Sequence, residues 1–132
     1  MIAARPRRSA LYMPAANARA IEKARDLTCD VVILDLEDAV APDAKEIARQ
    51  QAVEAVKAGG FGRREVVIRV NGLDTPWGAE DLAAAAAACP DAILAPKVSS
   101  AADVAAYDAG LSGETRLWVM IETCASLFAL ES

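Results

Sequence analysis

The sequence has 132 residues, of which 55% are hydrophobic, and a formal net charge of −5 at pH 7. This composition is that of a folded domain with a real core, so it argues against a disordered chain, and its acidic balance argues against a nucleic-acid-binding protein, which usually carries a basic face. The absence of histidine excludes triads and metal sites built on that residue, and the three widely spaced cysteines predict neither a disulfide framework nor a zinc site.

Short apolar runs alternate with alanine-rich helical patterns along the chain. Strands are predicted where the apolar runs lie, at residues 9–14, 30–36, 65–70, 92–98 and 116–122. Helices are predicted between them, at 17–27, from Pro42 and Asp43 to the stop at 58–60, from Thr75 and Pro76 to just before Pro90, at 100–110, and from Cys124 onward. Asn17 is a predicted N-cap, Asp43 and Glu46 resemble a capping box, and Ser100 with Asp103 predicts a third cap.

The spacing of the strands predicts the architecture. They begin near residues 9, 31, 65, 92 and 116, and each interval has the size of one βα unit. Five such units in tandem predict an α/β fold with a parallel sheet. Two arrangements fit: a small doubly wound sheet, and the first five units of a (β/α)₈ TIM barrel, which takes about 250 residues. The length of the chain favours the first, and the residues at the strand ends favour the second.

Polar residues stand at the end of every predicted strand, namely Tyr12; Asp35, Glu37 and Asp38; Arg69 and Asn71; Lys97; and Glu122. Parallel α/β folds carry their active sites at this edge of the sheet. Each residue alone has a structural interpretation, such as an ion pair between Arg69 and a strand-two carboxylate, but their gathering on one side favours a site. Carboxylates suit Mg²⁺, and an arginine fork suits a substrate carboxylate or a developing enolate oxygen. The residues therefore predict a Mg²⁺ enzyme acting on a small oxyacid.

A basic pair lies on the first predicted helix. Arg19 and Lys23 are four residues apart, so they share one face of the helix beside the end of the first strand. Two interpretations stay open, because such pairs are common on solvated helix surfaces but would also form a phosphate clamp at the mouth of a pocket.

No apolar run in the sequence approaches the ~20 residues of a membrane span. The basic N-terminus also lacks the apolar run of a signal peptide. We therefore expect a cytoplasmic protein.

Five motifs occur in order: "RSALYMPAANARAIEKA", "VVILDLEDAVAPDAK", "VVIRVNGLDTPWG", "ILAPKV" and "VMIET". Together they resemble the citrate lyase β-subunit-like branch of the HpcH/HpaI aldolase family, which includes malyl-CoA and citramalyl-CoA lyases, and they resemble its N-terminal part only. The resemblance implies a (β/α)₈ TIM barrel, commonly a trimer, in which residues 1–132 form the N-terminal portion of a single domain. It also implies an enzyme that uses Mg²⁺ to make or break a carbon–carbon bond between an acyl-CoA and a 2-oxo acid. From the net charge and the lack of a membrane span, we expect no nucleic acid or membrane partner.

The resemblance assigns roles to particular residues. It implies that Glu122 is a metal ligand and that Arg69 contacts the oxygen atoms of the substrate, and these two are the catalytic candidates. Glu37 and Asp38 are implied to line the metal pocket through water molecules, whereas Asp35 is a structural acceptor under the site. The residues implied to face the coenzyme A arm of the substrate are Tyr12, Arg19 and Lys23.

Two departures from the family pattern bear on activity. Family members usually have glycine after the strand-one proline, where this sequence has Ala15, whose Cβ could crowd the coenzyme or force another loop conformation. The second metal-ligand aspartate of the family is expected beyond Ser132.

Five units of eight would leave open strand edges, which are an aggregation hazard. The sequence leaves three states open: a natural truncation, a chain that closes its sheet by assembly, and a part of a longer enzyme. The alternative to an active lyase is a truncated, non-catalytic remnant or interaction module that retains a vestigial coenzyme A or metal site.

Overall fold

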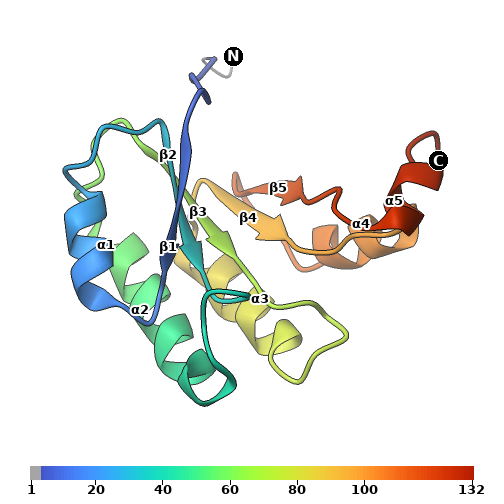
Figure 1. Cartoon of the computed structure of the whole chain (residues 1–132), viewed down its shortest axis with the longest axis horizontal. Coiled ribbons are helices and arrows are strands. Elements are labelled where there is room, and N and C mark those ends of the chain that lie inside the picture. Colours follow the sequence, from blue (N-terminus) through green and yellow to red (C-terminus); the bar gives the residue numbers. More distant parts are fainter. Residues whose placement is uncertain (1–3) are drawn as a thin grey trace.

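The five predicted strands form one sheet in which every neighbouring pair is parallel (Figure 1). The computed structural model describes residues 4–132. The strands are β1 (Ala10–Pro14), β2 (Val31–Asp35), β3 (Glu65–Arg69), β4 (Ala92–Ala95) and β5 (Arg116–Val119), and they lie side by side in the order of the chain.

The order of the strands decides between the two predicted architectures. A doubly wound sheet reverses its direction of growth at one point, whereas this sheet grows from β1 to β5 without a reversal. Right-handed crossovers that all advance in one direction place every helix on the same face of the sheet, as in a barrel. The prediction of the TIM-barrel type with about five βα units is therefore confirmed, and the described sheet is open at β1 and β5.

The helices follow the strands as predicted, with shorter bounds. They are α1 (Ala18–Ala24), α2 (Lys45–Ala58), α3 (Gly78–Ala88), α4 (Ala101–Asp108) and α5 (Cys124–Phe128), with a 3₁₀ turn η1 (Pro42–Ala44) before α2. The Asn17 side chain accepts a hydrogen bond from the Ala20 N–H, and that of Ser100 accepts one from the Asp103 N–H, so both predicted caps are confirmed.

One predicted cap and one predicted helix start are wrong. Asp43 lies inside η1, because Pro42 already supplies a helical φ one residue earlier, and no side chain caps η1 or α2, so there is no capping box. Helix α3 begins at Gly78 rather than at Thr75, because the Thr75 N–H and hydroxyl both donate to the Gly72 carbonyl and close a separate turn first.

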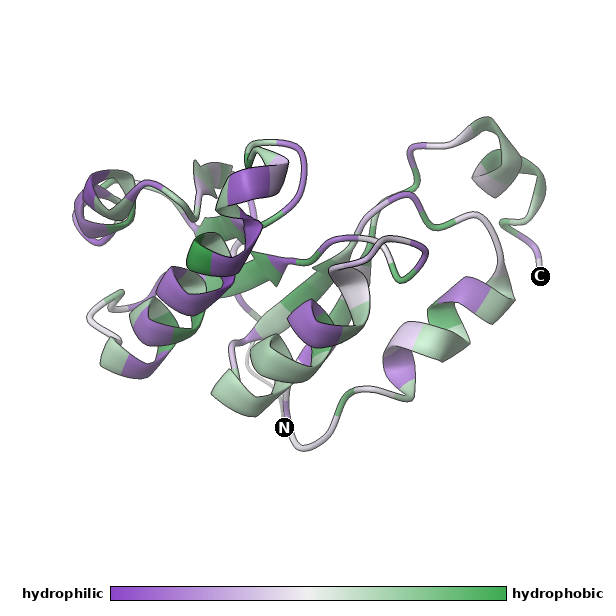
Figure 2. Cartoon of the chain, turned by 90° about the horizontal axis from the view of Figure 1, so that it is seen from below, coloured by the Kyte–Doolittle hydropathy of each residue, from purple (hydrophilic) through white to green (hydrophobic). Residues whose placement is uncertain are grey.

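Alternation along the strands divides the core into two faces. Residues such as Val32, Leu34 and Ile68 point to the outer face and pack under the helices. Their neighbours in sequence, including Ile33 and Val67, point to the inner face and form a second, smaller cluster that includes Trp118 and Met120. Figure 2 shows the hydrophobic strands in green behind helices that carry both hydrophilic and hydrophobic segments.

The strands end earlier than predicted, and this matters for the site. Strand β4 stops at Ala95, because Pro96 has no N–H to continue the ladder, and β5 stops at Val119. Lys97 and Glu122 therefore lie on loops just beyond the strands rather than within them. The three cysteines are free, as predicted. In the described part of the chain, no helix has the length and apolar character needed to cross a membrane.

Candidate functional site

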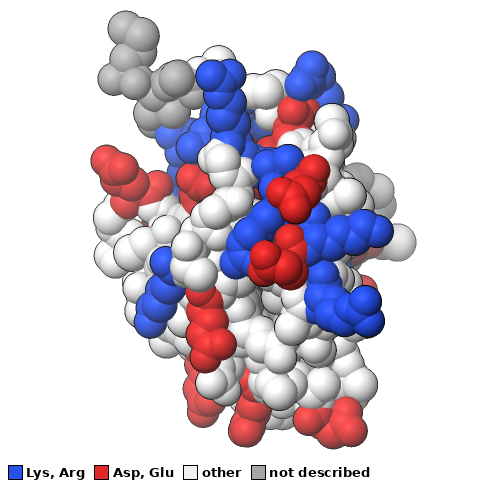
Figure 3. Space-filling view, turned by 90° about the vertical axis from the view of Figure 1, so that its left-hand side faces the viewer, with Lys and Arg blue, Asp and Glu red and all other residues white. Residues whose placement is uncertain are grey.

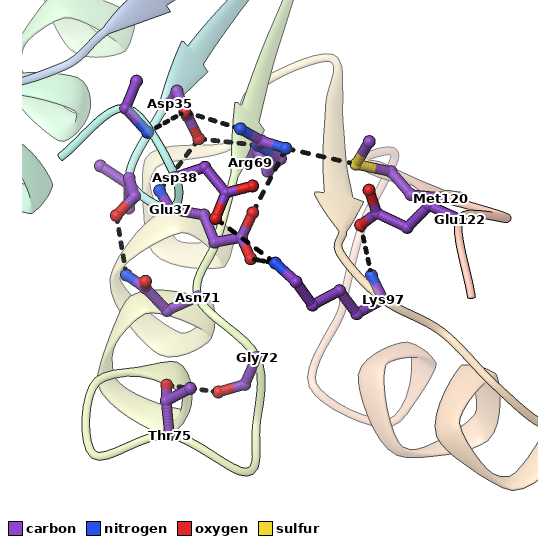
Figure 4. A network of polar contacts seen from close by, with 12 residues as sticks. Asp35, Glu37, Asp38, Arg69, Asn71, Gly72, Thr75, Lys97, Met120 and Glu122 are labelled. Carbon is purple, nitrogen blue, oxygen red and sulfur yellow. Dashed lines mark hydrogen bonds and ion pairs between the residues drawn. The ribbon is translucent and has the colours of Figure 1, made fainter. Parts of the chain in front are cut away.

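The polar strand ends meet in one network at the carboxyl edge of the sheet (Figure 4). Its centre is a buried pair: the Arg69 Nε and Nη2 atoms donate to the two carboxylate oxygens of Asp35, each at 2.7 Å. The N–H groups of Glu37 and Ala39 donate to the same carboxylate at 2.9 and 3.0 Å. Asp35 is fully buried and Arg69 is 7% exposed. These contacts support the expected role of Asp35 as a structural hydrogen-bond acceptor under the site.

The electrostatics of this pair follow from its contacts. Burial alone would raise the pKa of Asp35, but the hydrogen bonds from Arg69 and from the two backbone N–H groups outweigh it, and the pKa lies below its ordinary value. The hydrogen bond to Asp35 raises the pKa of Arg69, so the guanidinium stays charged. The pair therefore fixes one positive and one negative charge in a defined orientation under the site.

The pair leaves one edge of the guanidinium directed toward the other strand ends. Arg69 Nη1 lies 3.2 Å from Glu37 Oε1 and 3.5 Å from the sulfur of Met120. The planar face of the guanidinium lies over the ring of Tyr12, 4.8 Å from its centroid. Tyr12 is 42% exposed, and its ring and the Nη1 edge of Arg69 lie next to each other at the carboxyl edge of the sheet.

Glu37 is held between two cations. Its Oε2 atom accepts from Lys97 Nζ, which also lies 3.4 Å from Asp38 Oδ1. Its Oε1 atom is buried and makes no hydrogen bond, although it has the ion-pair contact with Arg69 at 3.2 Å. Buried carboxylate oxygens normally accept at least one hydrogen bond, so this oxygen could still accept one or bind a cation.

Glu122 joins the network through the main chain. The Lys97 N–H donates to Glu122 Oε1 at 2.8 Å, and the Glu122 side chain is otherwise exposed. The structure thus brings together Glu37, Asp38, Arg69 and Glu122, as the sequence predicted, and Lys97 connects the carboxylates.

Two positioning residues were missed by the sequence analysis. The buried Lys45 donates from Nζ to the carbonyls of Leu36 and Glu37 at 2.9 and 2.7 Å, and lies 5.3 Å from the centroid of the Trp77 ring. Burial lowers its pKa. It fastens the loop that carries the acidic residues, but in the sequence it looks like an ordinary lysine at a helix start.

Asp81 is the second. It is fully buried and accepts from the Asn71 N–H and side-chain amide at 3.0 and 2.6 Å and from Arg49 Nε at 2.7 Å. It thereby ties the end of β3 to α2 and α3. In the sequence it reads as a first-turn acid that merely favours the helix dipole, so no signal distinguished it.

The predicted clamp residues are separate from the network. Arg19 and Lys23 are exposed on α1, which packs on the outer face through Ile21 and Ala24, whereas Tyr12 lies on the inner face with Arg69. Because α1 begins directly after β1, Arg19 lies near the carboxyl edge of the sheet. Figure 3, which faces the left-hand side of Figure 1, shows basic side chains interspersed with acidic ones rather than a continuous basic surface.

Ala15, which stands where the family usually has glycine, has an ordinary backbone conformation. It is fully buried in the outer core, and among the described residues other than glycine only Cys89 and Lys97 have a positive φ. Its Cβ therefore packs inside the protein and imposes no backbone strain.

The strand-end oxygens fit a hard divalent cation in kind but not in number. Glu37 Oε1 lacks a hydrogen bond, and Asp38 and Glu122 present exposed carboxylates, which are the oxygen donors that Mg²⁺ prefers. Within residues 4–132, however, no three acidic or cysteine side chains are arranged to hold a metal by themselves. Further oxygen donors, such as substrate and water, are needed.

Two open grooves lie elsewhere, at the amino-terminal edge of the sheet. They have volumes of about 1370 and 990 Å³ and contain none of the strand-end residues. Ion pairs border the larger groove, with Arg7 bound to Glu65 at 2.7 Å and Arg5 to Asp91 at 3.0 Å. The charges of these two ion pairs neutralise one another, so the strand ends, with their exposed carboxylates, are the stronger candidate site.

Comparisons with known proteins identify the family of the chain. Residues 8–132 match the family described as HpcH/HpaI aldolase/citrate lyase. A (3S)-malyl-CoA thioesterase of Cereibacter sphaeroides is 50% identical over 120 residues, which cover 91% of this chain and 42% of that protein. An L-malyl-CoA/beta-methylmalyl-CoA lyase of the same species is 45% identical over 109 residues, which cover 80% of this chain and 34% of the lyase.

A solved structure is similar over the same region. Protein CitE of Mycobacterium tuberculosis, in complex with magnesium, acetoacetate and coenzyme A, matches with a TM-score of 0.73 and 28% identity, covering 94% of this chain and 44% of that one. The chain thus spans less than half the length of each of these relatives.

Proposed function

Because the chain belongs to the HpcH/HpaI aldolase/citrate lyase family, we propose that residues 1–132 form the N-terminal portion of a single TIM-barrel domain of a carbon–carbon lyase. It uses Mg²⁺ and cleaves a 3-hydroxyacyl-CoA such as malyl-CoA, citramalyl-CoA or citryl-CoA into an acyl-CoA and a 2-oxo acid. The observation that carries the proposal is the oriented Asp35–Arg69 pair at the edge where Glu37, Asp38 and Glu122 converge.

The charges of the site suit this reaction. Cleavage turns the substrate hydroxyl into a carbonyl and leaves the electron pair on the thioester enolate, which is then protonated. Arg69, with its Nη1 edge free of Asp35, donates to a substrate oxygen as negative charge develops there. Since Asp35 holds the guanidinium before substrate arrives, little reorganisation is needed in the transition state.

Glu122 is the proposed metal ligand, and Glu37 and Asp38 face the cation through water molecules. The Mg²⁺ ion supplies Lewis acidity and a template for the hydroxy-acid end of the substrate. The buried Glu37 oxygen without a hydrogen bond supports this assignment, as does the magnesium in the similar CitE structure. The remaining protein ligand, an aspartate, is proposed to follow Ser132.

Tyr12, Arg19 and Lys23 are proposed to bind the coenzyme A arm. Tyr12 offers an exposed ring at the inner edge of the site, and the two basic residues offer charges for phosphate groups. The CitE complex contains coenzyme A, which supports an acyl-CoA substrate rather than a free hydroxy acid. An oligomer, a trimer as in the family, and a cytoplasmic location complete the proposal.

A second function is favoured by one observation: 50% identity to a malyl-CoA thioesterase. That reaction consumes water and breaks the bond between the carbonyl carbon and sulfur, giving malate and free coenzyme A. The same site would bind the same ester, so the two functions differ in the bond that is cleaved.

The products distinguish the functions. Purified protein is incubated with malyl-CoA and Mg²⁺, and glyoxylate and free thiol are measured separately. Glyoxylate with acetyl-CoA supports the lyase, whereas malate with free thiol supports the thioesterase. Binding of the ester without either product supports the non-catalytic remnant or interaction module.

Glu122→Gln tests the metal assignment. The variant should lose Mg²⁺-dependent turnover and bind Mn²⁺ more weakly in calorimetry. Glu46→Gln, a charge change at an exposed residue of α2, is the matched control. Unchanged Mn²⁺ affinity in Glu122→Gln would remove Glu122 from the metal site.

A further inference from the structure

Lys97 has a backbone conformation that its surroundings in the sequence do not explain. Its φ is 51°, and among the described residues other than glycine only Cys89, with a φ of 56°, is also positive. Cys89 caps the C-terminus of α3 in the left-handed conformation, which is a common helix ending. Lys97 follows a strand instead, where this conformation costs energy for a residue with a Cβ.

In this conformation, the backbone N–H and the side-chain ammonium of Lys97 contact residues that follow different strands (Figure 4). Its backbone N–H donates to Glu122 beyond β5, while its side chain extends to Glu37 and Asp38 beyond β2. The Lys97 side chain is 54% exposed, so the strain is not offset by burial in the core. The hydrogen bonds that the Lys97 N–H and ammonium group donate are all to carboxylates.

Those carboxylates are the ones assigned above to the divalent cation and its water molecules. Glu37 Oε2 and Asp38 Oδ1 both face the Lys97 ammonium, while Glu37 Oε1 has an ion-pair contact with Arg69 and no hydrogen bond. A divalent cation that binds here must therefore compete with the Lys97 ammonium for Glu37 and Asp38.

We propose that Lys97 is an internal counter-cation of the strand-end carboxylates: it stabilises the pocket without metal and weakens the binding of the divalent cation by competing for Glu37 and Asp38. This proposal rests on the metal site in the proposed function. Lys97 is accordingly a positioning residue that tunes the affinity for metal, and its main-chain contact orients Glu122. When the cation binds, the ammonium moves away from the two carboxylates.

The proposal predicts opposite effects on two measurements. Without metal, Lys97→Met lowers the melting temperature, because Glu37 and Asp38 lose a neutralising charge. With metal, the same variant binds Mn²⁺ about fivefold to tenfold more tightly, since one positive charge near a divalent ion has been removed. If Lys97 had a purely structural role, its substitution would lower both the melting temperature and the affinity for Mn²⁺.

Matched variants separate charge from backbone strain. Lys97→Arg keeps the charge and should bind Mn²⁺ as the wild type does. Lys97→Gly removes the charge and relaxes the left-handed backbone, so it should bind as tightly as Lys97→Met while melting at a higher temperature. Lys57→Met removes an exposed charge from α2 and should change neither measurement.

Calorimetric titration with Mn²⁺ and thermal unfolding in EDTA give the two readouts. Tighter binding together with a lower melting temperature in Lys97→Met is the expected result. Unchanged or weaker binding in this variant, with normal binding by the wild type, overturns the proposal for Lys97 and leaves the metal site intact. A wild-type chain that binds no Mn²⁺ overturns both.

Discussion

Removing Asp35 should destabilise the protein more than most single substitutions do. Asp35→Ala takes away an acceptor of four hydrogen bonds, two from Arg69 and two from backbone N–H groups. It leaves a guanidinium that is 7% exposed without its main partner. Leaving one charge of a buried pair uncompensated costs about 3–5 kcal/mol, which corresponds to a decrease in melting temperature of about 10–20 °C for a chain of this size.

A double-mutant cycle tests the reasoning. Arg69→Met alone should cost about 3–4 kcal/mol, because it leaves a buried carboxylate. The double variant should cost about 2–3 kcal/mol less than the sum of the two single variants, because it leaves neither charge unpaired. Urea unfolding followed by circular dichroism measures all three, with Asp26→Asn as an exposed control within about 0.5 kcal/mol of the wild type.

The pH dependence of stability gives a second check on the pair. Folding lowers the pKa of Asp35, so the stabilisation is complete above the pKa of the unfolded chain and is lost as the pH falls through the lower pKa of the folded state. The Asp35→Ala variant should therefore lose less stability than the wild type across this acidic range. Additive single effects, or identical acid dependence in wild type and variant, would refute the buried pair.

Three further variants test other parts of the protein. Lys45→Met should cost about 2 kcal/mol in urea unfolding, because two carbonyl oxygens lose a charged donor. Gly78→Ala should cost about 1–3 kcal/mol, because its Cβ would collide with the backbone of the preceding turn. Replacing both Arg19 and Lys23 by alanine should weaken coenzyme A ester binding about tenfold, with a reduced salt dependence, whereas Lys57→Ala should not; equal affinity in all three proteins would remove the clamp.

The sequence predicted the elements that periodicity and local signals determine. Five apolar runs became five strands, and the polar residues after them converged because parallel strands place their carboxyl ends on one edge. The caps at Asn17 and Ser100 were predictable from their own side chains. Strand order was predictable only through the choice between two architectures, which the site residues favoured correctly.

The rest depended on contacts between segments far apart in the sequence. Lys45 matters because its ammonium group donates to two carbonyls of the loop after β2, and Asp81 because Asn71 and Arg49 donate to it from other elements. Nothing next to Lys97 predicts a left-handed backbone, which local preferences assign to glycine or asparagine. Such features arise from packing of the whole sheet, so periodicity carries no signal for them.

The three carboxylates after β2 illustrate how a buried strand can end in so much negative charge. Asp35 is fully buried and neutralised by Arg69, Glu37 is 8% exposed and shared between Arg69 and Lys97, and the Asp38 side chain is 67% exposed beside Lys97. The most exposed of the three, Asp38, has the longest ion-pair contact, at 3.4 Å. This is expected, because an unpaired charge costs less free energy near the solvent than in the interior. The innermost carboxylate is committed to structure, while the outer two keep the capacity to bind a cation and its water molecules.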